Sequence, residues 1–263
     1  MTDDHPAASV EAGPSVWNLA LRSLRSPYPL SISNAALMVL LVLMVPFYVF
    51  IAEWMPGRVL HAPEVALDRL VPLQPAWAMV YGSLYLFLIL LPLFVVRQSA
   101  QIRRTLLAYL AVWGAAYVCF LLYPTAAPRP ASVAGSGFAV WGLKFLYQAD
   151  PPFNCFPSLH VAHSAVSAMA SYLVHRGVGI VAAVCALLVG VSTLFTKQHY
   201  VLDVVAGIAL AAAAGIVFLR GSPRGSIPEL DRRAAPALAV GIIGILALVA
   251  AGFWAAYQFH VEG

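Results

Sequence analysis

The chain alternates between long apolar runs and shorter polar connections, and this pattern predicts its architecture. A helix of about 20 apolar residues crosses the hydrocarbon core of a bilayer, because its backbone satisfies its own hydrogen bonds there. Seven runs come close to that length and predict spanning helices at residues 35–52, 76–96, 103–123, 158–175, 177–196, 200–219 and 234–259. We therefore expect an all-α integral membrane protein.

Composition supports this class. Hydrophobic residues make up 62% of the 263 residues and charged residues 10%, which is far from the composition of soluble globular domains. The net charge is +4, but the basic residues form small clusters beside apolar runs, as membrane topology signals do, and not a nucleic-acid-binding stripe. The three cysteines are widely spaced, so we expect no disulfide framework, no metal site and no cofactor.

The chain divides into three parts. Residues 1–25 are expected to be a cytoplasmic tail, disordered over 1–20 and without the features of a cleavable signal. Residues 26–220 hold six spans and form the catalytic membrane domain, and 221–263 are a polar connector followed by the seventh span. The connection 53–75 is read as a solvated connector or a short interfacial helix. The connection 124–157 is longer than a turn requires, which predicts a functional role or a short helix near 138–147.

Basic residues also predict the orientation. Lys and Arg are more frequent before the first span and in the second–third, fourth–fifth and sixth–seventh connections than in the others. Connections rich in Lys and Arg stay in the cytoplasm, so the N-terminus is expected inside and the C-terminus outside. We expect a multi-pass plasma (inner) membrane protein in which 124–160 and 197–203 meet at the outer or periplasmic end.

Two polar stretches at the edges of apolar runs carry the candidate chemistry. Phe153–His160 ends in one histidine, and Thr196–Asp203 holds another, His199, four residues before Asp203. On a helix that spacing places the imidazole and the carboxylate on one face. A carboxylate with a histidine partner inside an apolar segment indicates function, although a single such pair can also be structural.

The residues of these stretches suit phosphoryl transfer, which needs a nucleophile, a proton donor for the leaving oxygen and positive charge for the phosphate. His199 could attack phosphorus while Asp203 holds its other ring nitrogen, and His160 could protonate the leaving oxygen. The topology brings three candidate cations to the same end: Arg129, Lys144 and Lys197. For Arg129 and Lys197 the alternative is an interfacial anchor that reaches lipid headgroups.

Three more residues are candidates for a substrate pocket. His163 lies one turn beyond His160 on nearly the same face, and its alternative is a histidine with satisfied hydrogen bonds inside the bundle. Gln198 and Tyr200 flank the proposed nucleophile.

These residues resemble a known family. Pro157-Ser158-Leu159-His160 and the stretch from Ser192 to Asp203 are similar to the second and third signature motifs of the type-2 phosphatidic acid phosphatase superfamily. The resemblance implies a six-helix core over about residues 30–220, here followed by a seventh C-terminal transmembrane helix, and metal-independent chemistry through a phosphohistidine. It also implies that His199 is the nucleophile, His160 the general acid, Asp203 the orienting carboxylate and Ser158 a phosphate contact.

The departures from the family pattern fall on the phosphate-binding side. Leu122 stands where the first motif usually has Lys, seven residues before Arg129-Pro130, and Thr193 stands where the third usually has Arg. Leu159 replaces the glycine before the second-motif histidine. The form Phe-Pro-Ser-Leu-His with Gln-His-Tyr is similar to the inositol phosphorylceramide synthase branch, whose members exchange headgroups between lipids.

Three functions stay open at this point. A lipid phosphatase lets water attack the phosphohistidine, whereas a phosphotransferase uses a lipid or polyol hydroxyl; both act on a lipid substrate from the bilayer, and both use the same triad. A proton-coupled transporter would place titratable residues throughout the membrane depth. Their clustering at one end favours an enzyme that acts on headgroups.

Overall fold

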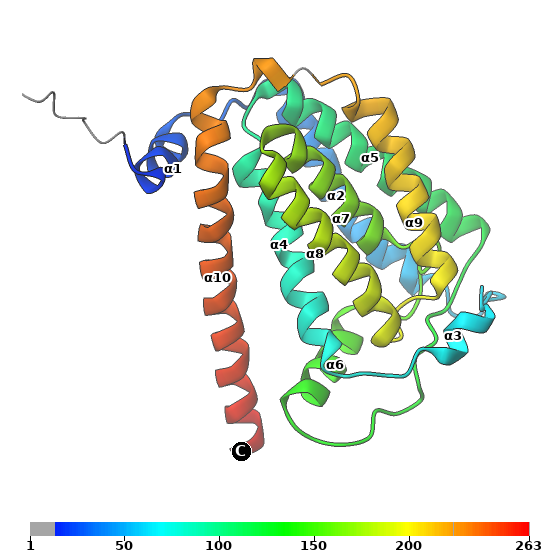
Figure 1. Ribbon diagram of the computed structural model, residues 1–263. Coiled ribbons are helices and arrows are strands. Elements are labelled where there is room, and N and C mark those ends of the chain that lie inside the picture. The colour runs from blue at the N-terminus through cyan, green and yellow to red at the C-terminus, as the bar shows by residue number, and fades with distance from the viewer. Residues whose placement is uncertain (1–13, 223, 263) are drawn as a thin grey trace, which may run out of the picture.

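The computed structural model describes residues 14–222 and 224–262, and in this part of the chain the architecture is helical (Figure 1). The helices are α1 Val16–Arg25, α2 Ile32–Glu53, α3 Ala66–Leu70, α4 Trp77–Val95, α5 Ser99–Leu122, α6 Phe138–Ala149, α7 Leu159–Val174, α8 Arg176–Phe195, α9 Val201–Ala214 and α10 Glu229–Glu262. A π-helical turn, Gly215–Leu219, continues α9, and a 3₁₀ turn, Arg224–Ser226, precedes α10.

Six helices are long and apolar enough to cross a membrane: α2, α4, α5, α8, α9 with its π-helical turn, and α10. They indicate a multi-pass membrane protein, as the apolar runs predicted. The expected fourth span is α7, which has only 16 residues where a spanning helix needs about 20. The count of seven crossings therefore stays a prediction.

Helix α7 lies at the centre of the bundle and packs against α4, α5, α8 and α9. Its small side chains Ser164, Ser167 and Ser171 are fully buried, and small residues let helices approach closely where lipid gives no hydrophobic driving force. The long connection with α6 lies at the end of the bundle where α7 and α9 begin, together with α3 (Figure 1).

Glycine 207 brings α9 against the start of α7. A Cβ atom at this position would lie 2.6 Å from the carbonyl oxygen of Ser158, a separation that real Cβ contacts do not tolerate. Only glycine permits this approach, and the approach places the starts of α7 and α9 side by side.

The long helix α10 stands along one side of the bundle and contacts α4 and α1 (Figure 1). At its start Asp231 accepts a hydrogen bond from Ser23 Oγ at 3.0 Å and lies 3.9 Å from Arg97 Nε. This contact corrects the expectation of a disordered tail for residues 16–20, because α1 buries Leu19 and Ala20. The tail predicted at residues 1–13 lies outside the described residues. Helix α10 also begins at Glu229, within the segment expected to be a polar connector.

Candidate active site

His199 and Asp203 form the pair that their spacing predicted, but not within one helix. His199 precedes α9, which begins at Val201. Its Nδ1 lies 3.2 Å from Oδ2 of Asp203, and that oxygen also accepts the backbone N–H of Tyr200 at 2.9 Å. Asp203 is fully buried and His199 is 4% exposed. A buried carboxylate held in this way fixes the imidazole with its proton on Nδ1, which leaves the lone pair on Nε2.

His160 lies in the first turn of α7 and meets the free side of His199. Its Nδ1 is 3.2 Å from Nε2 of His199. Ser158 caps α7 through its hydroxyl, which accepts the N–H of Val161 at 3.4 Å. His160 and His199 are 39 residues apart in the sequence, so the two histidine stretches converge on one point in the fold.

A second carboxylate completes this constellation, and the sequence pattern did not single it out. Asp150 lies within the long connection as the C-cap of α6, and its Oδ2 lies 3.9 Å from Nε2 of His160. Its Oδ1 accepts the hydroxyl of Tyr48 at 2.9 Å. A weak signal was available, because Asp150 lies only ten residues before His160 in the same connection.

Two tyrosines of α4 lie against His160. The ring centroids of Tyr81 and Tyr85 are 5.2 and 4.8 Å from that of His160, both edge to face. Tyr81 lies inside the bundle at 4% exposure. They form an aromatic wall around the imidazole.

The guanidinium of Arg129 lies near the site, with protein acceptors for its nitrogens. Nε donates to Oε1 of Gln198 at 2.9 Å, Nη1 to the carbonyl of Tyr147 at 3.1 Å and Nη2 to that of Asp150 at 2.9 Å. It also lies over the ring of Tyr147, 4.6 Å from the centroid. Arg129 thus braces the long connection against the third motif, and Gln198 is its partner there.

The other candidate cations point elsewhere. Lys197 Nζ donates to the backbone carbonyls of Asp68 and Val71, at 3.2 and 2.5 Å, so it holds the connection around α3. Lys144 has an exposed side chain on α6. The structure does not bring either ammonium group into contact with the two histidines.

The remaining predicted pocket residues are buried. His163 stacks on Tyr109 with ring centroids 4.2 Å apart, and its Nδ1 accepts the indole N–H of Trp113 at 3.4 Å. This is the environment of a histidine satisfied inside the bundle. Tyr200 forms the N-cap of α9, and burial raises the pKa of its phenol, so it stays neutral.

Thr193 and Leu122 stand where the motifs of the resembled family usually have Arg and Lys, and neither provides a positive charge. Thr193 is buried and its hydroxyl donates to the carbonyl of Gly190 at 2.7 Å. Leu122 is exposed at the end of α5. The starts of α7 and α9, however, both lie at the site. The first N–H groups of a helix have no partner within it and carry partial positive charge, which suits an anionic phosphate.

One group in the described chain has the composition and spacing of a metal site. The ligand atoms of Cys155, His199 and Asp203 lie within 4.8 Å of one another, and all three residues are buried. Burial, with the carboxylates of Asp203 and Asp150, raises the pKa of the Cys155 thiol well above its ordinary value. An ion would compete with the His199–Asp203 hydrogen bond, so this set fits catalytic positioning better than a resident metal.

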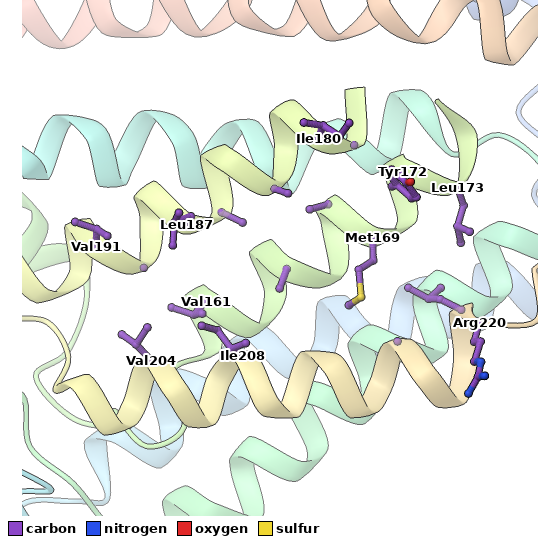
Figure 2. Close-up of a pocket in the computed structure, with 18 of the residues that line it drawn as sticks. Val161, Met169, Tyr172, Leu173, Ile180, Leu187, Val191, Val204, Ile208 and Arg220 are labelled. Carbon is purple, nitrogen blue, oxygen red and sulfur yellow. The ribbon is translucent and has the colours of Figure 1, made fainter. Parts of the chain in front are cut away.

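Two apolar cavities flank α7. A groove of about 620 Å³ is lined by α7, α8 and α9; Figure 2 shows Val161 and Val204, which follow His160 and Asp203 in sequence, towards one end of it and Arg220 at the other. A second cavity of about 420 Å³ lies among α2, α4, α5 and α7, and Tyr85 and His163 line it.

Comparison with known proteins identified a family. A family model described as the PAP2 superfamily matches residues 53–217, the segment from the end of α2 to the π-helical turn after α9. Comparisons with curated proteins and with solved structures gave no match.

Proposed function

The chain belongs to the PAP2 superfamily, whose model matches more than half of its length, and we propose that it is a membrane-embedded lipid phosphatase. Membership indicates a phosphatase or phosphotransferase. The finer proposal is hydrolysis of a lipid phosphate through a phosphohistidine, without a metal, at the non-cytoplasmic end of the bundle.

One observation carries this proposal: the alignment of His160, His199 and Asp203. Asp203 holds Nδ1 of His199 at 3.2 Å, and His160 faces Nε2 of His199 at 3.2 Å. The nitrogen with the lone pair therefore points towards His160, and the 3.2 Å separation of the two nitrogens must widen when a phosphate enters. A proton donor for the leaving oxygen stands beside that nitrogen, as nucleophilic catalysis requires.

The reaction follows from these positions. The lone pair of His199 Nε2 forms a bond to phosphorus, the bond to the lipid oxygen breaks, and that oxygen takes the proton from His160 Nδ1. Water then attacks the phosphohistidine and gives a proton to His160, while the P–N electron pair returns to His199. Asp203 stabilises the imidazolium form of His199 between the two steps.

Charge on the phosphate must be met by a small set of groups. We propose that the first N–H groups of α7 contact its oxygens, with Ser158 at the α7 cap, whereas the N–H of Val201 at the start of α9 already donates to Asp68. Arg129, with Nη2 4.0 Å from the Asp150 carboxylate, adds positive charge near the site. Lys197 and Lys144 could bind the phosphate only if the segments that carry them moved.

The second candidate is a phosphotransferase that passes the phospho-headgroup to a lipid or polyol hydroxyl. The observation that favours it is the presence of two separate apolar cavities on opposite sides of α7. A hydrolase needs room for one lipid, whereas a transferase must hold a donor and an acceptor. Similarity of the motifs to the inositol phosphorylceramide synthase branch points the same way.

The fate of the phosphate separates the two. Purified protein in detergent would be given a lipid labelled in its phosphate, with and without a diacylglycerol, a ceramide or a polyol. Release of inorganic phosphate at a rate independent of acceptor supports the phosphatase. Label that moves to the acceptor supports the transferase, and the absence of both products with every donor would refute an enzyme of this class.

A further inference from the structure

Asp150 stands on the side of His160 that faces away from the proposed nucleophile. Its Oδ2 lies 3.9 Å from Nε2 of His160, while Nδ1 of the same ring faces His199. We infer that Asp150 is a positioning residue that orients His160 and stabilises the imidazolium form that protonates the leaving oxygen. This inference rests on the proposed phosphohistidine reaction.

The inference follows from assigning protons to the ring nitrogens of His199 and His160. Asp203 accepts from Nδ1 of His199, so Nε2 of His199 carries a lone pair. The 3.2 Å contact from that lone pair to Nδ1 of His160 then requires an N–H on Nδ1. The other nitrogen of His160 faces a carboxylate, and an imidazole meets a carboxylate favourably only through an N–H. The protonated ring that general acid catalysis needs would therefore turn its second N–H towards Asp150.

The surroundings of Asp150 hold its carboxylate in place. Tyr48 donates its hydroxyl to Oδ1 at 2.9 Å, and the N–H of Asp150 donates to the carbonyl of Leu146 at 3.1 Å. Arg129 Nη2 donates to the carbonyl oxygen of Asp150 at 2.9 Å. The carboxylate is 15% exposed. With Oδ1 and the backbone held, Oδ2 is the oxygen that is left for His160.

An ion pair with Arg129 alone does not explain this arrangement. Charge-assisted N–H···O bonds have lengths of about 2.7–2.9 Å, so Oδ2 of Asp150 is hydrogen-bonded neither to Arg129 Nη2, at 4.0 Å, nor to His160 Nε2, at 3.9 Å. The guanidinium directs its N–H groups to carbonyl oxygens and to Gln198 instead. Asp150 is thus close to Arg129 without being hydrogen-bonded to it through the carboxylate.

The charges around His160 show why the Asp150 carboxylate matters for the protonated form of the ring. In the described chain, the charged groups that act on this ring are Asp150, His199 and Arg129, and of these only Asp150 favours the cation. Tyr81 and Tyr85 of α4 face the ring with neutral aromatic edges and faces, and His163 lies one turn along α7. A buried imidazolium is unfavourable unless an opposite charge is near. Without Asp150 the protonated form of the general acid would be less stable still.

The role of Asp150 in the reaction is therefore limited and specific. When the P–O bond breaks, its electron pair takes the Nδ1 proton of His160, and the ring becomes neutral with its other proton still facing Asp150. Water attack on phosphorus returns a proton to Nδ1. Asp150 touches neither phosphorus nor the leaving oxygen, and it gains no proton in either step.

The test is a leaving-group series on the full-length protein with Asp150→Asn. A general acid contributes about 10²–10⁴-fold to rate and matters most for poor leaving groups. We expect D150N to lower kcat by at least about tenfold on an alkyl lipid phosphate, and by much less on an aryl phosphate whose phenolate leaves without a proton. His160→Asn should show the same selectivity more strongly. Asp231→Asn, which changes another partly buried carboxylate near an arginine at the start of α10, is the matched control and should leave the selectivity unchanged.

Tyr48→Phe is a second variant that keeps every carboxylate. It removes the hydrogen bond to Oδ1 and should reproduce the selectivity in weaker form, also if D150N does not purify as a folded protein. Equal losses on alkyl and aryl substrates in the folded variants, or no loss, would overturn the inference. Failure of the proposed function itself would be seen separately, as wild-type protein that turns over neither substrate.

Discussion

The backbone N–H of Ser158 donates to the carbonyl oxygen of Asp203 at 3.0 Å. This bond joins the cap of α7 to the first turn of α9, so the helices that carry the two histidine stretches cannot shift independently at the site. Backbone contacts as well as the two side chains therefore bring His160 close to His199.

The first prediction concerns the nucleophile. His199→Ala should lower activity by about a thousandfold or more, because loss of a nucleophile removes the covalent route altogether. Activity on a lipid phosphate and the elution volume in detergent would be measured together. His61→Ala is a control, since His61 is exposed and stacks on Tyr123 at the same end of the bundle. Substantial turnover by folded H199A would exclude His199 as the nucleophile.

The second prediction concerns helix approach. Gly207→Ala should lower both activity and the apparent Tm, because the new methyl group would meet the backbone of Ser158, which cannot rotate away. Overpacking of this kind costs about 1–3 kcal/mol.

Gly114→Ala is the matched control for this variant. It lies within α5, and a Cβ there would meet nothing within 4 Å. Replacing a helical glycine by alanine stabilises by about 0.5–1 kcal/mol, so its Tm should stay constant or rise. Equal effects of the two substitutions would mean that the approach of α9 to Ser158 does not decide the stability of the site.

The third prediction concerns metals. Activity should survive EDTA, because the proposed reaction uses only side chains, and Cys155→Ser should retain most of it. The candidate ligands Cys155, His199 and Asp203 make this a stringent test. Loss of activity with EDTA, restored by zinc but not in C155S, would show that this group holds an essential ion.

Hydropathy predicted the helices well because each long apolar run must satisfy its backbone internally. The expected span 177–196 is α8 to within a residue. Helix α1 was not predicted, because its stability comes from packing of Leu19 against α10 and from the contact of Ser23 with Asp231, which is 208 residues away. Contacts of that sequence separation leave no local pattern.

The site likewise combines residues that local motifs predicted with residues that only contacts between distant segments bring in. His160, His199 and Asp203 sit in short motifs with chemically meaningful spacing, and the structure brings them together. Asp150 and Tyr48 come from different segments and meet only through the folding of the long connection. The topology placed Arg129 among the candidate cations for phosphate, but its side-chain direction depends on Gln198 and on carbonyls that the sequence does not locate.

The last prediction separates the brace formed by Arg129 from its charge. The guanidinium joins Gln198 to the carbonyls of Tyr147 and Asp150, and hydrogen bonds from charged groups contribute about 1.5–3 kcal/mol each. Arg129→Gln should therefore lower Tm and, well below that Tm, still lower kcat by about a hundredfold, the cost of removing a charge-stabilising group. Arg129→Lys cannot form the planar fork, so its Tm should also fall, but it keeps the positive charge and should keep more of the activity.

Lys197→Gln is the control, because its ammonium is held by carbonyls near α3 and its loss should change kcat little. A K197Q variant as impaired as R129Q would identify Lys197 as the phosphate-binding cation, and wild-type kcat in folded R129Q would show that the charge of Arg129 takes no part in catalysis.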